Sequence, residues 1–415
     1  MEKTKGIGLY LSNKSDKNLI INKITSNSFL LDYQDLSSLK GVLHSAVTID
    51  KLIREEILHD KFIVKSIGNQ SLGSMSSGQQ KRALLTYLVS QKPGYMVLDD
   101  IYSNIDQETL HSITNELARI STSTFLVQIF FRKQDLLPFI PTVLTVDENN
   151  QVVSVENAGT FLQAKSTHSD NHTFTLPEEY DENHSGINPL VQLNQVSVRY
   201  GAKPVLDKIS WTIRKGEFWQ LKGPNGSGKS TMLSVIVGDN PRGYGQDMVL
   251  FGRKKGSGES IWDIKRQIGY FTPSMTHQFT RDESVENMII SGLLDSVGLY
   301  TEPSDMQRDI AKKWLGCLDP SYRHKSFQSL SIGQQRMVMT ARAMVKHPPL
   351  LILDEPTIEL DDENSRIFTE MVNAIASTGK VAIIYVSHRD EPGLNPDKIF
   401  ELVAGENGSI GVIRP

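Results

Sequence analysis

Short apolar runs alternate with longer segments of helical periodicity along the second half of the chain. Strands are predicted at 191–198, 209–213, 217–222, around Tyr270 and Phe271, at 350–353 and at 381–386. Helices are predicted at 230–238, between 282 and 318 with interruptions at Pro303 and Pro320, and from the Leu330 region to Val345. Because runs such as 350–353 are apolar at every position, they are typical of a parallel sheet covered on both faces. The pattern therefore predicts an α/β fold.

Two stretches of the first half repeat stretches of the second half in the same register. Met75-Ser-Ser-Gly-Gln-Gln80 matches Leu330-Ser-Ile-Gly-Gln-Gln335, and Tyr95-Met-Val-Leu-Asp-Asp100 matches Leu350-Leu-Ile-Leu-Asp-Glu355. The interval from Ser76 to Asp99 equals the interval from Ser331 to Asp354. Two halves with the same order and spacing of motifs indicate two copies of one domain.

A polar stretch separates the two copies. It is rich in acidic residues and has little to bury, as expected for a linker. We therefore predict a first domain at 1–164, a linker at 165–188 and a second domain at 189–415. The linker contains His168, His172 and His184, which we interpret as solvated side chains because no neighbouring ligand has the usual metal-site spacing.

Composition excludes several classes of protein. A chain of 415 residues, 39% hydrophobic and 22% charged, is too long for one core and suits two or three domains. The net charge of −4 gives no electrostatic basis for direct nucleic-acid binding. Cys317 is the only cysteine, which excludes a disulfide within the chain and fits a reducing cytoplasm. No apolar run reaches the roughly 20 residues that a membrane helix needs, and no signal peptide is visible.

The most informative stretch fits the pattern G-x-x-x-x-G-K-[ST]. Its members are Gly223, Pro224, Asn225, Gly226, Ser227, Gly228, Lys229, Ser230 and Thr231. Glycines let successive backbone N–H groups cup a phosphate chain, the lysine supplies charge to the β- and γ-phosphates, and the Ser230 hydroxyl supplies a ligand to Mg²⁺. A predicted strand before the motif and a predicted helix after it provide the required context. The sequence therefore predicts a nucleotide site rather than a glycine-rich surface loop.

The first half contains no such motif. From Leu190 to Ser331 the second half spans 331 − 190 = 141 residues, whereas from Gly6, taken as the matching start, to Ser76 the first half spans 76 − 6 = 70. About seventy residues are missing, and no G-x-x-x-x-G-K-[ST] occurs before Met75. We therefore predict that the first domain is incomplete and has lost its phosphate loop.

The order of four motifs resembles the ATP-binding cassette family. These are the phosphate loop, Leu330-Ser-Ile-Gly-Gln334, Leu350–Glu355 and the isolated Ser387-His388. The stretch Phe251–Tyr270 and the two-copy layout resemble the two-cassette ModF type, soluble ATP-binding proteins associated by name with molybdate transport. The resemblance implies two cassettes in tandem, the first incomplete, each with a RecA-like parallel sheet and a helical subdomain.

The resemblance also implies ATP and Mg²⁺ as ligands and a role for individual residues. Asp354, with Ser230, would hold Mg²⁺, and Glu355 would act on the attacking water. His388 would contact the γ-phosphate together with Lys229. Tyr200 would stack on the adenine ring; the alternative is a strand tyrosine packed in a core.

In this family the Leu330-type motif begins a helix that faces the γ-phosphate bound by the opposite cassette. The first half retains Ser76, Ser77, Gly78 and Gln79 at this motif. We therefore expect one active composite site, in which these residues meet the ATP of the second cassette within one chain. The alternative is a homodimer that pairs the second cassettes of two chains.

The sequence departs from the family pattern at three places. Thr272-Pro273-Ser274 follows the strand at 268–271, where the family has a glutamine that senses Mg²⁺, and Gln278 is out of register. Asp100 stands where the second half has Glu355. Phe130-Phe131-Arg132 stands where the second half has Ser387-His388. The first departure indicates altered coupling, and the other two indicate a first cassette without normal ATPase chemistry.

We expect a cytoplasmic ATPase that hydrolyses Mg-ATP at the second cassette as the ATP-binding component of a molybdate-type transport system. An integral membrane permease would then be its partner, and the protein would lie peripherally at the inner face of the plasma membrane. The sequence also allows two alternatives: a non-transport cassette protein that regulates or remodels a complex, and a nucleotide-responsive clamp with little turnover.

Overall fold

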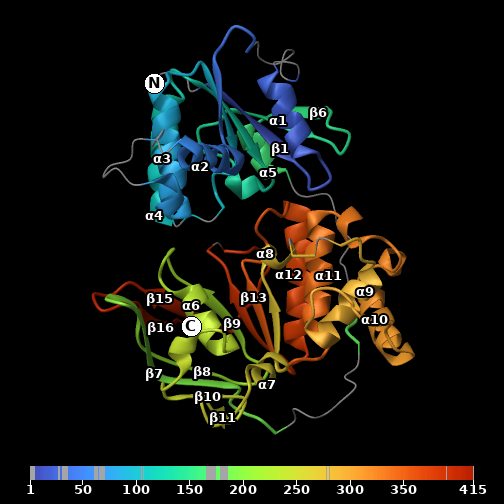
Figure 1. The fold of residues 1–415 in the computed structure, drawn as a ribbon. Helices are drawn as coiled ribbons and strands as arrows, with labels where there is room; N and C mark the ends of the chain where they lie inside the picture. The colour runs from blue at the N-terminus through green and yellow to red at the C-terminus, as the bar shows by residue number, and fades with distance from the viewer. Residues whose placement is uncertain are drawn as a thin grey trace. The chain divides into compact units, whose positions relative to one another are not determined.

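The chain forms two compact units in a computed structural model (Figure 1). The first unit consists of residues 1–170 with Glu359–Asp362, and the second of 171–358 with 363–415. The structure describes residues 5–26, 29, 36–59, 64, 71–103, 105, 107–164, 174–177, 186–276, 278–279, 281–388 and 390–414. The linker histidines His168, His172 and His184 lie outside these residues.

The second unit contains two sheets. Its strands are β7 (Val191–Tyr200), β8 (Lys203–Ile213), β9 (Phe218–Lys222), β10 (Met248–Leu250), β11 (Arg253–Lys254), β12 (Ile268–Phe271), β13 (Leu350–Asp354), β14 (Ala382–Val386), β15 (Lys398–Val403) and β16 (Ile410–Arg414). One sheet has the order β12-β13-β14-β9-β15-β16 and is parallel except for β16. The other is antiparallel, with the order β11-β10-β7-β8. The predicted strands are therefore confirmed.

Helices surround the parallel sheet of the second unit. They are α6 (Lys229–Val237), α7 (Ile261–Lys265), α8 (Pro273–Thr276), α9 (Val285–Ser291), α10 (Asp305–Cys317), α11 (Ile332–Met344) and α12 (Asp362–Ser377), with 3₁₀ turns η3 (Pro241–Gly243), η4 (Gly292–Leu294), η5 (Pro320–Tyr322) and η6 (Phe327–Ser329). Helix α6 lies on one side of the sheet and α11 and α12 on the other (Figure 1). The prolines Pro303 and Pro320 flank α10, as predicted, because a proline cannot continue a helix.

Helix α6 is buried between the two sheets of this unit. Its residues Met232, Leu233 and Ile236 share one apolar cluster with Trp211 of the antiparallel sheet and Ile384 of the parallel sheet. The helix is therefore apolar around most of its circumference, and its first residue is fixed at the carboxyl ends of the parallel strands. In parallel sheets, ligands bind at this edge.

The first unit contains one sheet. Its elements are β1 (Gly6–Leu11), α1 (Lys17–Thr25), β2 (Gly41–His44), α2 (Ala46–His59), η1 (Leu72–Ser74), α3 (Ser77–Ser90), β3 (Tyr95–Asp99), α4 (Gln107–Ile120), β4 (Phe125–Phe130), η2 (Lys133–Asp135), β5 (Thr142–Val146), β6 (Val152–Asn157) and α5 (Ala158–Gln163). One face packs on α1 and the other on α2, α3 and α4. Asn13 and Asp361 of this unit also exchange two hydrogen bonds of 2.7 Å.

The sheet order β2-β3-β4-β1-β5-β6 repeats the order of the parallel sheet in the second unit. Strand β1 thus corresponds to β9, the strand before the phosphate loop, and not to β7. Matching Gly6 with Leu190 was therefore wrong. Gly6 pairs with Leu126 of β4, and Phe218, its counterpart in β9, pairs with Ile383 of β14. Among the described residues, the first unit has no counterpart of the antiparallel sheet, and this accounts for part of the missing length.

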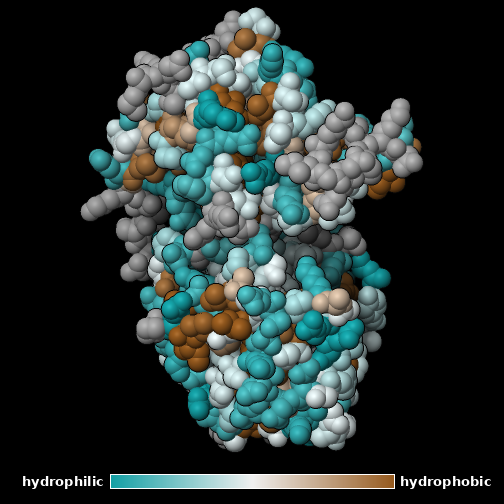
Figure 2. All heavy atoms as spheres, turned by 90° about the vertical axis from the view of Figure 1, so that its left-hand side faces the viewer, coloured by the Kyte–Doolittle hydropathy of each residue, from teal (hydrophilic) through white to brown (hydrophobic). Residues whose placement is uncertain are grey.

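Hydrophilic residues predominate on the face in Figure 2, and hydrophobic residues gather there only in small patches. Within the described ranges, no helix is both long enough and apolar enough to cross a membrane.

Candidate functional site

The loop between β9 and α6 has a backbone that requires glycine. Gly223, Gly226 and Gly228 have φ angles of 150°, 77° and 93°, in a region that other residues rarely adopt. A Cβ on Gly223 would lie 2.7 Å from Ser227 Oγ, and a Cβ on Gly228 would lie 2.7 Å from a Leu206 methyl carbon. The glycines therefore allow both the turn and the close packing of the loop onto its neighbours.

The residues at the start of α6 suit an anionic ligand. The Lys229 ammonium donates to the carbonyl oxygens of Gly223, at 2.7 Å, and Pro224, at 3.1 Å. The buried Ser227 hydroxyl has no hydrogen-bond partner within the described chain, and Ser230 is exposed. The N-terminal N–H groups of a helix attract phosphate. Asn225 lies in the loop before α6, and Thr231 lies in the first turn of that helix. The predicted phosphate-binding stretch Gly223–Thr231 therefore forms one continuous cradle.

The acidic residues lie at the neighbouring strand end. Strand β13 ends at Asp354, and Glu355 turns away with a φ of 53° while its N–H donates to Val386 O at 3.0 Å. His388 follows β14, and its Nε2 lies 3.1 Å from Glu355 Oε1. Its Nδ1 lies 3.4 Å from Lys229 Nζ. The structure thus brings Lys229, His388 and Glu355 into one line of contacts.

The environment raises the pKa of both acidic residues. Burial, and then the charge of Asp354, raises the pKa of Glu355 to about 7, although Lys229 acts against this shift. Burial also raises the pKa of Asp354, while the Tyr270 hydroxyl and Lys229 favour its ionised form. A carboxylate with a pKa near neutrality can accept a proton from water and release it again.

Tyr270 is a site residue that the sequence reasoning missed. Its hydroxyl donates to Asp354 Oδ2 at 3.4 Å, and burial raises the pKa of that hydroxyl well above its ordinary value. The residue was predicted only as part of a strand. The parallel pairing of β12 with β13 places Tyr270 beside Ile352, and sequence spacing does not reveal this neighbour. After β12, Thr272 leads into α8, and Gln278 is exposed.

Tyr200 lies at the end of β7 and is not packed in a core. Its side chain is 48% exposed, and its hydroxyl accepts a hydrogen bond from Asn240 Nδ2 at 2.9 Å. An exposed aromatic ring could stack on a planar base.

The repeated stretches Met75–Gln80 and Leu330–Gln335 have the same local structure in the two units. Ser76 caps α3 and Ser331 caps α11, each with a reciprocal hydrogen-bond pattern that involves Gln79 or Gln334. Ser77 begins α3, Gly78 is buried against Thr109, and Ser76 and Gln79 are exposed. The Ser76 end of α3 is thus an intact helix N-terminus with backbone N–H groups.

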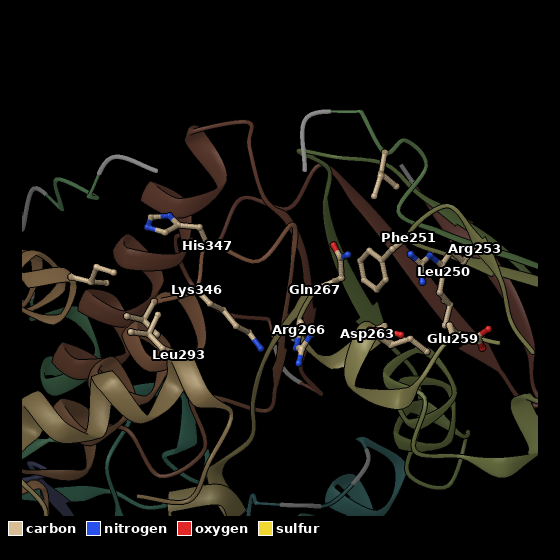
Figure 3. Close-up of a pocket in the computed structure, with 14 residues that line it drawn as sticks. Leu250, Phe251, Arg253, Glu259, Asp263, Arg266, Gln267, Leu293, Lys346 and His347 are labelled. Carbon is tan, nitrogen blue, oxygen red and sulfur yellow. The ribbon is translucent and has the colours of Figure 1, made fainter. Parts of the chain in front are cut away.

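The second unit also contains a cavity of about 540 Å³ away from the phosphate loop. Arg253, Glu259 and Asp263 line one side, and Lys346 and His347 at the end of α11 line the other (Figure 3). None of its lining residues belongs to Gly223–Thr231 or to the Asp354–Glu355 pair. The cavity is therefore separate from the phosphate cradle.

Comparisons with known proteins agree with this geometry. Residues 206–358 match the ABC transporter family. The ABC transporter ATP-binding protein ModF of Escherichia coli (strain K12) is 34% identical over 83% of this chain and 74% of ModF. The zinc uptake system ATP-binding protein ZurA of Listeria innocua is 35% identical over 49% of this chain and 77% of ZurA.

Solved structures include cbiO1 from Clostridium perfringens, part of the ABC transporter complex cbiONQ. It covers 54% of this chain and 88% of its own, with 23% identity and a TM-score of 0.47. The family match and the similarity to ModF over most of both chains are the stronger findings. The chain therefore belongs to the ATP-binding cassette family of ATPases and is similar in particular to ModF.

Proposed function

We propose that the second unit binds Mg-ATP at Gly223–Thr231 and hydrolyses its terminal phosphate. The observation that carries this proposal is the line of contacts from Lys229 through His388 to Glu355. It joins the phosphate cradle to a carboxylate whose pKa is about 7. A cradle alone would support binding, whereas an adjacent base supports turnover.

Each side chain has a distinct task in the proposed reaction. The Glu355 carboxylate accepts a proton from the attacking water. His388, held against Glu355 at 3.1 Å, orients that carboxylate and reaches toward the terminal phosphate. Lys229 exchanges its contacts with the loop carbonyls for contacts with the β- and γ-phosphates. Most of the rate enhancement then comes from charge positioned around the transferring group.

Ser230 and Asp354 would hold the magnesium ion. Their oxygen donors fit a hard cation, and Asp354 lies at the end of a buried strand with one carboxylate oxygen held by Tyr270. A bound Mg²⁺ would supply positive charge that neutralises the phosphates. Tyr200 is the proposed platform for the adenine ring, which its exposure permits.

We further infer that the protein is the ATP-binding component of a transport system, with an integral membrane permease as its partner. The similarity to ModF, an ABC transporter ATP-binding protein, supports this role. A molybdate-type cargo and a peripheral position at the cytoplasmic face of the plasma membrane are parts of the same proposal. Similarity to a zinc uptake protein over half of the chain shows that cassettes of this kind occur with other cargoes.

We infer that the first domain supplies the partner surface for this site. The intact helix N-terminus at Ser76–Gln79 supports pairing within one chain, because its N–H groups suit a γ-phosphate. Pairing of second domains from two chains is the competing arrangement.

The deciding experiment compares ATP turnover of the wild type with Glu355→Gln. Loss of the base is expected to lower kcat by at least about 100-fold while ATP binding persists. Glu302→Gln, at a glutamate whose side chain is 91% exposed, is the matched control and should leave turnover unchanged. Equal kcat in wild type and Glu355→Gln would contradict the proposal and favour a nucleotide-responsive clamp.

A further inference from the structure

The first unit has a loop at the position that the phosphate loop occupies in the second. Leu9 pairs with Ile129, which pairs with Asp99. Leu221 pairs in the same way with Val386, which pairs with Asp354. Counting on from these matched leucines places Lys17 at the position of Lys229. Both lysines are the first residue of a nine-residue helix, α1 or α6.

The glycines of the cradle are replaced in this loop. Leu11, Lys14 and Asp16 stand at the positions of Gly223, Gly226 and Gly228. None of the three has a positive φ angle, and Asp16 has a φ of −83°. The backbone therefore cannot follow the path that directs successive N–H groups toward a phosphate in the second unit.

Asp16 occupies the N-cap of α1, as Gly228 occupies the N-cap of α6. Its carboxylate accepts a hydrogen bond from the N–H of Leu19 at 2.9 Å. An anion thus already satisfies the positive end of α1. A phosphate entering this position would meet a carboxylate of the same charge instead of open N–H groups.

Lys17 has a different partner from Lys229. Its ammonium lies 3.1 Å from Asp99 Oδ1, and Asp99 is the counterpart of the proposed metal-holding Asp354. Asp99 is only 7% exposed. Burial alone would lower the pKa of Lys17, but its attraction and hydrogen bond to Asp99 outweigh burial and raise it. The lysine cation therefore stands beside the carboxylate at which a metal would be held.

We propose that the first unit is a self-filled cassette, in which the Asp16 carboxylate replaces a phosphate and the Lys17 ammonium replaces the metal ion at Asp99. The stability of the first unit then depends on the Lys17–Asp99 pair and not on a bound nucleotide, and the unit binds no ATP. This inference rests on the proposed nucleotide site of the second unit. It implies that each chain binds one nucleotide. It also implies that the Ser76 end of α3 is available as a partner surface whether or not nucleotide is bound.

The first test counts nucleotides bound to the full chain by calorimetric titration with Mg-ADP. One per chain is expected for the wild type and for Lys17→Met, with a Kd that differs by less than twofold. Lys229→Ala should show no binding at concentrations that saturate the wild type. Two per chain, or binding in Lys229→Ala that disappears on adding Lys17→Met, would overturn the inference. No binding to the wild type would instead overturn the proposed function itself.

The second test measures the stability of the first unit. All four tryptophans, Trp211, Trp219, Trp262 and Trp314, lie in the second unit, so their fluorescence follows that unit alone. Circular dichroism follows both. Lys17→Met should lower the unfolding midpoint seen by circular dichroism by about 5 °C or more, because Asp99 stays buried without its cation.

Lys14→Met is the matched control for this stability test. Lys14 belongs to the same loop, and its pair with Glu148 is 3.8 Å long and exposed on both sides; its loss should leave the midpoint within about 1 °C. Lys17→Arg should retain most of the wild-type midpoint, and the double variant Lys17→Met/Asp99→Asn should recover part of the loss. A Lys17→Met chain as stable as Lys14→Met would contradict the inference.

Discussion

Glu355 Oε1 and His388 Nε2 lie 3.1 Å apart at the ends of two adjacent strands, β13 and β14. This contact links the carboxylate to the phosphate cradle, because the other ring nitrogen of His388 lies 3.4 Å from Lys229 Nζ. Strand pairing, and not proximity in sequence, creates the arrangement. The proposed hydrolysis depends on it.

The first prediction concerns the pH dependence of turnover. Glu355 must be ionised to accept a proton, and its pKa in the nucleotide-free protein is about 7. The kcat/KM for ATP should therefore rise with pH below about 7 and level off above it. Steady-state assays between pH 5.5 and 8.5 measure this profile. Glu302→Gln should reproduce the wild-type curve, and a flat wild-type profile would contradict the assignment of the base.

The unfolding free energy should also depend on the ionisation of Glu355, but it should fall as pH rises. The folded protein holds the Glu355 proton more tightly than the unfolded chain, whose glutamate has a pKa of 4.5. Stability therefore falls as pH rises from 4.5 through about 7. Glu355→Gln removes this loss, so its gain in unfolding free energy over wild type should grow by about 2 kcal/mol between pH 5 and pH 8. Tryptophan fluorescence in urea measures it; a constant difference between the two proteins would count against the raised pKa.

Gly228→Ala should damage both the fold and the nucleotide site. The residue has a φ of 93°, and its added Cβ would lie 2.7 Å from a Leu206 carbon and 2.9 Å from a Val205 carbon. We expect a loss of at least about 2 kcal/mol in unfolding free energy and a tenfold weaker Kd for Mg-ADP.

Gly245→Ala separates backbone strain from crowding. Gly245 has a φ of 78° with nothing within 4 Å of the added Cβ. This variant should lose only about 1 kcal/mol and bind Mg-ADP normally. Similar losses in the two variants would show that crowding at the loop is unimportant.

Ser76→Arg tests pairing within one chain. A bulky cation at the exposed N-cap of α3 would obstruct the surface proposed to face the ATP of the second domain. Turnover should fall by at least about tenfold. Ser90→Arg, at the exposed C-terminal end of the same helix, is the control. If Ser76→Arg is fully active and Ser331→Arg is inactive, second domains of two chains pair instead.

Much of the fold followed from the sequence because its signals are local. Continuous apolar strands, the glycines before Lys229 and the repeated serine–glycine–glutamine motif each report on a few neighbouring residues. The internal repeat predicted two related domains, and the two sheets do share one strand order.

Other features depend on strand pairing that spacing does not reveal. The place of Tyr270 beside Asp354 comes from the register of β12 on β13. The loop from Leu11 to Lys17 does not fit the phosphate-loop pattern, because other residues stand at the glycine positions. Only the pairing of β1 with β4 identifies Lys17 as the counterpart of Lys229. Matching Gly6 with Leu190 as the starts of the two domains therefore placed the missing residues incorrectly.

The most direct test of the account is ATP turnover in a matched pair of lysine variants, Lys229→Ala and Lys17→Met. The two lysines occupy equivalent positions, but only Lys229 lies in a glycine cradle joined to Glu355 through His388. We predict that Lys229→Ala lowers kcat/KM by at least about 100-fold and that Lys17→Met stays within about twofold of wild type. Substantial turnover in Lys229→Ala, or loss of turnover in a folded Lys17→Met chain, would contradict a single nucleotide site in the second unit.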